Sequence, residues 1–143
     1  MILYCDTSAL VKLYVAEPHR ERVAAGAEAA EAVATSRIAW AEFHAATARR
    51  EREVPADAAA MEQARQLLAA DWHRYVVMEV AQRVVERAGE YADAFALRGY
   101  DAVHLASAAE AADRSGREVC FACFDKRLNK AARLLRLKTL PDR

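Results

Sequence analysis

Residues 2–8 read Ile-Leu-Tyr-Cys-Asp-Thr-Ser, an apolar run that stops at a carboxylate followed by two hydroxyl side chains. The run from Ile2 to Cys5 is apolar throughout, without alternation between apolar and polar residues. This pattern is typical of a strand that is covered on both faces, and therefore of a parallel sheet. A helical pattern of apolar residues, including Leu10 and Val11, follows directly. The start of the chain therefore predicts a buried parallel strand that ends on the acidic side chain of Asp6.

Further strand-like runs alternate with helical patterns along the rest of the chain. We expect strands at residues 2–5, 32–35, 75–78 and 118–124, and a short edge strand at 137–140. We expect helices at residues 7–16, 18–30, 37–52, 55–70, 79–96, 101–114 and 126–135. Such alternation indicates an α/β fold, a three-layer α/β/α sandwich with a mostly parallel central sheet. The length of 143 residues fits one domain spanning residues 1–143.

The composition argues against several classes of protein. Apolar residues make up 55% of the chain, which is well above the content of a disordered protein, and the formal net charge is +0. A neutral chain is not steered as a whole toward nucleic acid or an anionic membrane. No apolar run approaches the roughly 20 residues of a membrane span, and the N-terminus lacks the basic start of a signal peptide. We therefore expect a cytoplasmic protein without a membrane partner.

All three cysteines, Cys5, Cys120 and Cys123, lie in strand-like runs. An odd number of cysteines without an export signal favours reduced thiols. Cys120 and Cys123 have the C-x-x-C spacing of some metal and redox sites, but residues three apart in a strand point to opposite faces. We therefore expect these cysteines to be small buried hydrophobic residues.

Two acids lie at the ends of predicted strands. Asp6 ends the first strand and Asp125 ends the fourth. In open parallel sheets, ligands bind outside the carboxyl ends of the strands, which makes both residues candidates for a site. Each residue also precedes a predicted helix, where aspartate is a good N-cap. For either residue alone, capping is the simpler interpretation.

Two further acids lie on predicted helices. Glu42 has apolar neighbours three and four residues away, such as Ile38 and Ala45. A lone charge that faces into packing is costly unless a cation pairs with it, whereas a tilted helix would leave Glu42 at a wet boundary. Asp101 begins a helix, where the partial positive charge of the helix N-terminus favours an ionised carboxylate. A plain capping or first-turn role for Asp101 is the alternative.

Taken together, the four acids are more informative than each one alone. They come from distant parts of the chain and can converge at one edge of the sheet. Several carboxylates in one cleft cannot all stay ionised without a cation. A site made only of oxygen ligands suits Mg²⁺ or Mn²⁺, and sites of this kind carry out phosphoryl chemistry.

Four blocks of the sequence resemble, in order, those of PIN-domain ribonucleases, and the length is similar to that of the toxins of VapBC toxin–antitoxin pairs. The blocks are DTSALVKLY at 6–14, WAEF at 40–43, YDAVHLASA at 100–108 and FDKRL at 124–128. The resemblance implies an α/β/α fold and an Mg²⁺- or Mn²⁺-dependent endoribonuclease that acts on RNA. It also implies a cognate antitoxin that occupies the cleft, and a homodimer.

The resemblance also assigns roles to the acids. It implies that Asp6, Glu42, Asp101 and Asp125 are catalytic. On this hypothesis Asp6 is the central metal ligand, and Asp101 is a direct or water-mediated one. Glu42 orients or deprotonates the attacking water, and Asp125 completes the cage or supports a second ion. The expected products carry a 5′-phosphate and a 3′-hydroxyl.

Three small polar residues are candidate accessory groups. Cys123 stands two residues before the last acid, where the family often has Thr or Ser, so a hydroxyl group near the metal is missing there. Thr7 and Ser8, which follow Asp6, are the remaining candidate hydroxyl groups.

The C-terminal part of the chain is basic. From Lys126 onward there are seven Lys or Arg residues and one acid, Asp142. Basic residues beside an acidic pocket are suited to hold an RNA backbone, with a solvated helix face as the alternative. The candidate backbone contacts are Arg98, Lys126, Arg127 and Lys130.

Three other residues near the acids have mainly structural interpretations. His104 follows Asp101 by three residues and shares its side of the helix. We expect a packed core histidine, with a role beside the metal or as general base as the alternative. We expect Trp40 and Phe43 in the core, the alternative being a groove for a partner helix.

Alternative functions are less compatible with the acids. An inactive PIN-like module that acts through protein partners is the main one, and the presence of all four acids argues against it. A phosphoacceptor signalling domain needs paired acids after the first strand. A phosphatase of the haloacid-dehalogenase type needs a second aspartate at position 8, where Ser8 stands.

Overall fold

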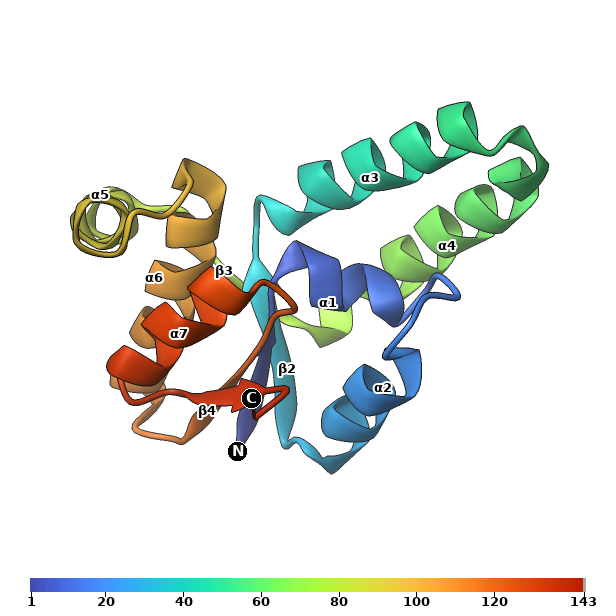
Figure 1. Ribbon diagram of the computed structural model, residues 1–143. Helices are drawn as coiled ribbons and strands as arrows, with labels where there is room; N and C mark the ends of the chain where they lie inside the picture. Colours follow the sequence, from blue (N-terminus) through green and yellow to red (C-terminus); the bar gives the residue numbers. More distant parts are fainter. Residues whose placement is uncertain (143) are drawn as a thin grey trace.

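The strands of the sheet lie in the order β3-β2-β1-β4-β5, and each pairs in parallel with its neighbours (Figure 1). A computed structural model describes residues 1–142 of the protein. Its strands are β1 (Ile2–Cys5), β2 (Ala32–Ser36), β3 (Val76–Met78), β4 (Val119–Ala122) and β5 (Lys138–Leu140). The expected α/β fold with a parallel sheet is confirmed, including the short edge strand.

The helices follow the expected order along the chain. They are α1 (Thr7–Lys12), α2 (Arg20–Ala29), α3 (Ala39–Glu53), α4 (Ala58–Asp71), α5 (Gln82–Phe95), α6 (Gly99–Ser115) and α7 (Lys126–Leu134). Short 3₁₀ turns, η1 (Pro55–Asp57) and η2 (Trp72–Arg74), flank α4. None of the helices within residues 1–142 combines the length and the apolar character that a membrane crossing requires.

Helix α1 is shorter than expected, ending at Lys12 where the pattern of apolar residues continued to residue 16. The Leu13 N–H donates to the Leu10 carbonyl at 3.1 Å, and the Tyr14 N–H donates to the Val11 carbonyl at 3.0 Å. This i to i−3 spacing is that of a 3₁₀ turn, which commonly closes an α-helix. The apolar side chains beyond Lys12 thus belong to the closing turn and not to a further α-helical turn.

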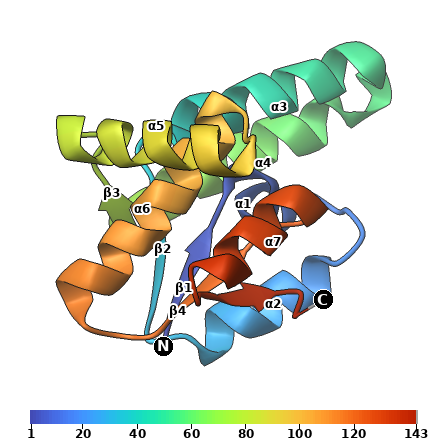
Figure 2. The same ribbon diagram turned by 60° about the vertical axis from the view of Figure 1, so that its left-hand side comes forward.

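Helices cover both faces of the sheet (Figures 1 and 2). On β1, Leu3 and Cys5 point into a core cluster shared with α1 to α4, whereas Ile2 and Tyr4 point into a second cluster shared with α6 and α7. Helix α5 packs on α6 through a third, smaller cluster. All four side chains of β1 are buried, as the unbroken apolar run predicts.

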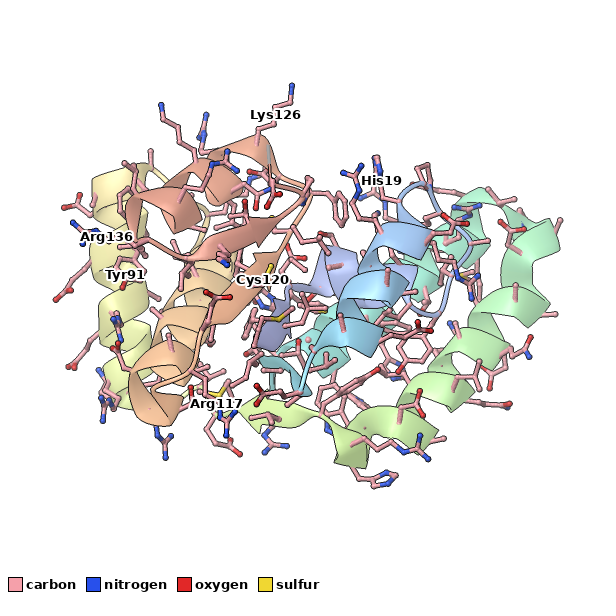
Figure 3. The ribbon with its side chains drawn as sticks, turned by 90° about the horizontal axis from the view of Figure 1, so that it is seen from below. His19, Tyr91, Arg117, Cys120, Lys126 and Arg136 are labelled. Atoms are coloured by element: carbon pink, nitrogen blue, oxygen red, sulfur yellow. The ribbon has the colours of Figure 1, made fainter. Side chains whose placement is uncertain are left out.

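Strand alternation also separates the cysteines. Cys120 lies in the cluster on the α1 to α4 side, and Cys123 lies in the cluster on the α6 and α7 side. Cys5, Cys120 and Cys123 are all buried and free. Figure 3 shows Cys120 in the interior of the molecule. The prediction that the C-x-x-C spacing brings no two sulfurs together is confirmed.

Helices α3 and α4 pack against each other and extend beyond the sheet (Figure 1). Phe43 is fully buried on α3, as expected. The expectation for Trp40 is wrong, since this side chain is 37% exposed and its ring packs on Trp72 with centroids 5.1 Å apart. Trp40 is the second residue of α3, and the apolar pattern did not reveal that its face of the helix is covered less fully than that of Phe43.

The sheet has a topological switch point beside β1. The chain runs outward from β1 to β2 and β3, and then crosses back to add β4 and β5 on the other side of β1. The Asp6 N–H donates to the Ala122 carbonyl at 3.1 Å, so the ends of β1 and β4 lie side by side. Ligands of open α/β sheets bind in the crevice at this point.

Two adjacent leucines on α4 test the burial of this helix. Leu68 is 0% exposed in the cluster on the α1 to α4 side, whereas Leu67 is 46% exposed. We expect Leu68→Ala to lower the free energy of unfolding by about 2–5 kcal/mol, because it opens a cavity in the core. Leu67→Ala is the matched control and should cost less than about 1 kcal/mol. Urea unfolding measures both, and equal losses would contradict this packing.

Candidate active site

The four predicted acids lie at the carboxyl edge of the sheet. Asp6 follows β1 and Asp125 follows β4, and these strands are neighbours at the switch point. Asp101 lies in the first turn of α6, and Glu42 lies in the first turn of α3. The first turns of α1 and α7 rise from this same edge of the sheet (Figure 2). The fold therefore gathers residues that are up to 119 positions apart in the sequence.

The electrostatics of Asp101 show that the four carboxylates act on one another. Burial is the largest cause that raises the pKa of Asp101 above its ordinary value. The negative charges of Asp6 and Asp125 raise this pKa further. His104 opposes the shift, and Glu42 adds to it. Asp101 is thus a carboxyl group whose pKa is raised first by burial and then by the negative charges beside it.

Asp6 is buried and is also the N-cap of α1. Its Oδ1 accepts hydrogen bonds from the Ala9 N–H at 2.9 Å and from the Ser8 hydroxyl at 2.7 Å. The capping interpretation is therefore confirmed. Both bonds use Oδ1, so capping engages only one of the two carboxylate oxygens and is compatible with a second role.

Asp125 caps α7 in the same way. Its Oδ1 accepts from the Leu128 N–H at 2.8 Å, and its side chain is exposed. The Asp125 N–H lies 3.3 Å from the Cys123 sulfur. Burial raises the pKa of the Cys123 thiol, and the charge of Asp6 adds to this, so the thiol stays protonated. Cys123 therefore contacts the backbone of Asp125 and does not act as a charged ligand.

Glu42 is held by two side chains from other elements. Its Oε1 accepts from the Thr7 hydroxyl at 2.7 Å and lies 2.7 Å from His104 Nε2. Burial disfavours its charged form, but the hydrogen bond and charge of His104, together with the Thr7 hydroxyl, outweigh this and lower the pKa of Glu42. The side chain is 28% exposed, and Ala45 on the same helix face is exposed. Glu42 therefore lies at a boundary that water reaches, as the alternative interpretation expected. Its carboxylate is nevertheless held in place by Thr7 and His104.

His104 is buried, and it is also bonded to the site. Its Nδ1 lies 2.9 Å from the Tyr4 hydroxyl, while its Nε2 faces Glu42. The expectation of a buried histidine is confirmed, and the alternative of a role beside the acids is supported by the same contacts. The spacing from Asp101 correctly predicted the side of the helix on which His104 lies. The contact with Tyr4 was not predicted, because Tyr4 reads as one more residue of an apolar strand.

Lys12 is a further residue beside the acids that the sequence did not single out. It lines a cavity of about 380 Å³ together with Thr7, Ser8 and Glu42. Its Nζ lies 4.9 Å from the centre of the Phe124 ring. The i, i+4 spacing from Ser8 on α1 is the signal that could have identified it.

The predicted RNA contacts all have exposed side chains. Arg98 is the N-cap residue of α6, and Lys126, Arg127 and Lys130 lie on α7. The guanidinium of Arg127 donates to the Ala96 carbonyl at 3.2 Å, whereas Lys126 projects into solvent (Figure 3). The last basic residue of the C-terminal segment, residue 143, lies outside the described residues.

The chemistry of the donors fits a hard divalent cation. Within residues 1–142, no three His, Cys, Asp or Glu side chains are already arranged around one metal position. The side chains that share the site are carboxylates, and oxygen is the ligand that Mg²⁺ and Mn²⁺ prefer. Burial and, after it, the charges of Asp6 and Asp125 raise the pKa of Asp101, and a cation beside these carboxylates would favour their ionised forms.

Comparison with known proteins agrees with this geometry. The sequence model of the PIN domain matches residues 3–134. Ribonuclease VapC45 of Mycobacterium tuberculosis (strain CDC 1551 / Oshkosh) is 32% identical over 140 residues, covering 98% of this chain and 95% of that protein. Ribonuclease VapC49 of Mycobacterium tuberculosis (strain ATCC 25618 / H37Rv) has the same identity and coverage.

Solved structures share the fold. VapBC2 from Rickettsia felis has a TM-score of 0.60 at 14% identity, covering 91% of this chain and 92% of that one. A toxin–antitoxin complex from Klebsiella pneumoniae has a TM-score of 0.58 at 19% identity, covering 84% of each chain. The resemblance read from the four sequence blocks is confirmed. Because the family model matches most of the sequence and the relatives align with nearly all of it, the chain belongs to the PIN-domain family.

Proposed function

We propose that this chain is an endoribonuclease, the toxin of a type II toxin–antitoxin pair, which hydrolyses RNA phosphodiester bonds in the cytoplasm. The observation that carries this proposal is the position of four acids at one edge of the sheet: Asp6 and Asp125 follow the neighbouring strands β1 and β4, and Glu42 and Asp101 lie in the first turns of α3 and α6. The names of the curated relatives, both ribonucleases at 32% identity, support the same activity. Residues 1–143 act as one nuclease domain on this proposal.

Asp6 and Asp101 are the proposed ligands of Mg²⁺ or Mn²⁺, and Asp125 completes the acidic site. When bound, the cation supplies Lewis-acid activation of water and stabilisation of charge on the phosphate. Asp6 is well placed for this role because capping of α1 occupies Oδ1 and fixes its carboxylate. Asp125 is fixed in the same way by the Leu128 N–H.

Glu42 orients the attacking water on this proposal. His104 and Thr7 both bond Oε1, and they outweigh burial to lower the pKa of Glu42. A carboxylate with a lowered pKa is a weaker proton acceptor, which favours orientation of water over its deprotonation. Thr7 therefore assists Glu42, and Ser8 assists Asp6. The proposed products carry a 5′-phosphate and a 3′-hydroxyl.

Exposed basic side chains hold the RNA backbone beside these acids. Lys126, Arg127 and Lys130 follow Asp125 on α7, and Arg98 precedes Asp101. Contacts of this kind fix the position of the RNA without reading its bases. RNA can then bind beside the acids even though the chain as a whole carries no net positive charge.

We also propose a cognate antitoxin that covers the site, and a homodimer. One of the structures with the same fold is a toxin–antitoxin complex from Klebsiella pneumoniae, which supports an antitoxin partner. Trp40, near the start of α3, offers an apolar ring that is 37% exposed. An inactive PIN-like module that acts only through protein partners is the alternative function, and metal binding distinguishes the two.

Replacing the capping acids by asparagine separates their two roles. Asn caps a helix as well as Asp does, so Asp6→Asn should fold with unchanged or slightly higher stability, because it also removes a like charge. Cleavage of structured RNA should fall about 100-fold or more, since a metal ligand is lost. Asp93→Asn, an exposed change on α5, is the matched control. Full activity of Asp6→Asn would refute the assigned role.

Metal binding can be measured without any RNA. We expect calorimetric titration of Mn²⁺ to give binding to the wild type and at least about tenfold weaker binding to Asp6→Asn and Asp101→Asn. Chelation by EDTA should abolish cleavage, and added Mg²⁺ or Mn²⁺ should restore it. If the wild type gives no binding heat and no metal-dependent cleavage, the inactive module becomes the better interpretation.

The basic residues of α7 can be tested by the salt dependence of RNA binding, measured with Asp6→Asn protein so that no cleavage occurs. The added double change Lys126→Ala and Lys130→Ala should weaken binding and reduce the slope of log K against log salt by about 1.5. Lys138→Ala on β5 is the control, because this lysine pairs with Glu118 at 3.1 Å. An unchanged slope would indicate that the α7 lysines form only a solvated helix face.

A further inference from the structure

We infer that Tyr4 and His104 are positioning residues of the site: the Tyr4 hydroxyl determines which nitrogen of His104 carries the proton, and His104 thereby holds Glu42 in place. This inference rests on the proposed nuclease function, in which Glu42 orients the attacking water. It assigns a role to two buried residues that act through Glu42.

The three side chains form a continuous chain of hydrogen bonds across three elements. Tyr4 on β1 lies 2.9 Å from Nδ1 of His104 on α6, and Nε2 of the same ring lies 2.7 Å from Oε1 of Glu42 on α3. Tyr4 and His104 belong to the α6 and α7 side of the sheet, whereas α3 belongs to the opposite layer. His104 thus joins the two layers at the edge where the acids gather.

A count of protons gives the direction of each bond. An ionised carboxylate only accepts, so the bond to Glu42 requires a proton on Nε2. A neutral imidazole then has a bare Nδ1, which accepts the single proton of the Tyr4 phenol. Thr7 fits the same scheme, because its hydroxyl donates to Glu42 Oε1 at 2.7 Å. The Nε2 atom of His104 also lies 3.1 Å from the Thr7 hydroxyl oxygen, but the shorter bond, at 2.7 Å, is the one to the Glu42 carboxylate, on which the chain ends.

Packing alone does not account for the phenol of Tyr4. The ring is fully buried and stacks on Phe121 with centroids 5.7 Å apart and planes 11° apart. A phenylalanine would fill this space without a polar group, and a buried hydroxyl that is left unpaired destabilises the folded state. The hydroxyl is instead paired with His104. The polar atom therefore serves the histidine and, through it, Glu42.

The consequence for catalysis is preorganisation. A free glutamate side chain loses rotamer entropy when it is fixed. The chain from Tyr4 fixes Glu42 during folding, before the substrate binds. Loss of such supporting groups typically lowers activity about 10–100-fold while the ligands themselves remain.

Kinetics of three variants test this chain of bonds. We expect kcat for RNA cleavage to fall about 10-fold in Tyr4→Phe and about 100-fold in His104→Leu. KM should change less than about twofold, because the RNA contacts lie elsewhere. His104→Gln keeps an N–H donor near Glu42 and should recover most of the loss. Tyr14→Phe is the control. It removes the hydroxyl of a half-buried tyrosine on the opposite side of the sheet, where this hydroxyl bonds Asp71 at 2.9 Å. This variant should keep full kcat.

A double-variant cycle and ring spectra separate positioning from general damage. In a Glu42→Gln background, Tyr4→Phe and His104→Leu should cause no further loss of kcat, since their effect passes through Glu42. In ¹⁵N–¹H spectra of the histidine ring, the wild type should show a bare Nδ1 and a protonated Nε2. Tyr4→Phe should shift the Nδ1 signal.

The outcomes that overturn the inference are distinct from failure of the proposed function. A protonated Nδ1 in the wild type would overturn it, and so would an active wild type with fully active Tyr4→Phe and His104→Leu variants. Additive losses in the Glu42→Gln background would also overturn it. A wild type that cleaves no RNA would overturn the nuclease proposal, and the assigned role of Tyr4 and His104 with it.

Discussion

The burial of β1 on both faces is the constraint on which the site depends. All four side chains of this central strand are covered, so its polar continuation can begin only where the strand leaves the sheet. Its neighbour β4 ends at the same level, because the Asp6 N–H bonds the Ala122 carbonyl. Two acids are thereby brought to one edge by the pairing of two strands, without any attraction between the acids themselves.

Bringing like charges together costs free energy, and the surrounding structure offsets this cost locally. Asp6 and Asp125 each cap a helix, and Glu42 is bonded to Thr7 and His104. Asp101 has no comparable bond among the described residues, and burial together with the charges of Asp6 and Asp125 raises its pKa. A carboxylate can therefore cap a helix and also belong to the site, because the helix ends stabilise the carboxylates that the proposed nuclease chemistry requires.

Much of this arrangement is predictable from the sequence, because it depends on local patterns. Unbroken apolar runs predict the parallel strands, and strand ends predict the positions of Asp6 and Asp125. The contact between Tyr4 and His104 is not predictable in this way, since the residues are 100 positions apart and Tyr4 reads as one more apolar strand residue. The exposure of Trp40 was missed because it depends on which face of α3 is covered: Phe43 is fully buried, whereas Trp40 packs on Trp72 and stays 37% exposed, a tertiary property that helical periodicity does not contain.

The bridge that His104 makes between α6 and α3 has a mechanical consequence. The bond to Glu42 is 2.7 Å long, so a displacement of α3 against α6 by little more than an ångström would break it. On the proposed mechanism, a protein that separated these two helices would stop cleavage without covering the acids, because Glu42 would lose its bond to His104. This fold therefore allows two routes of inhibition: displacement of α3 against α6, and occupation of the cleft.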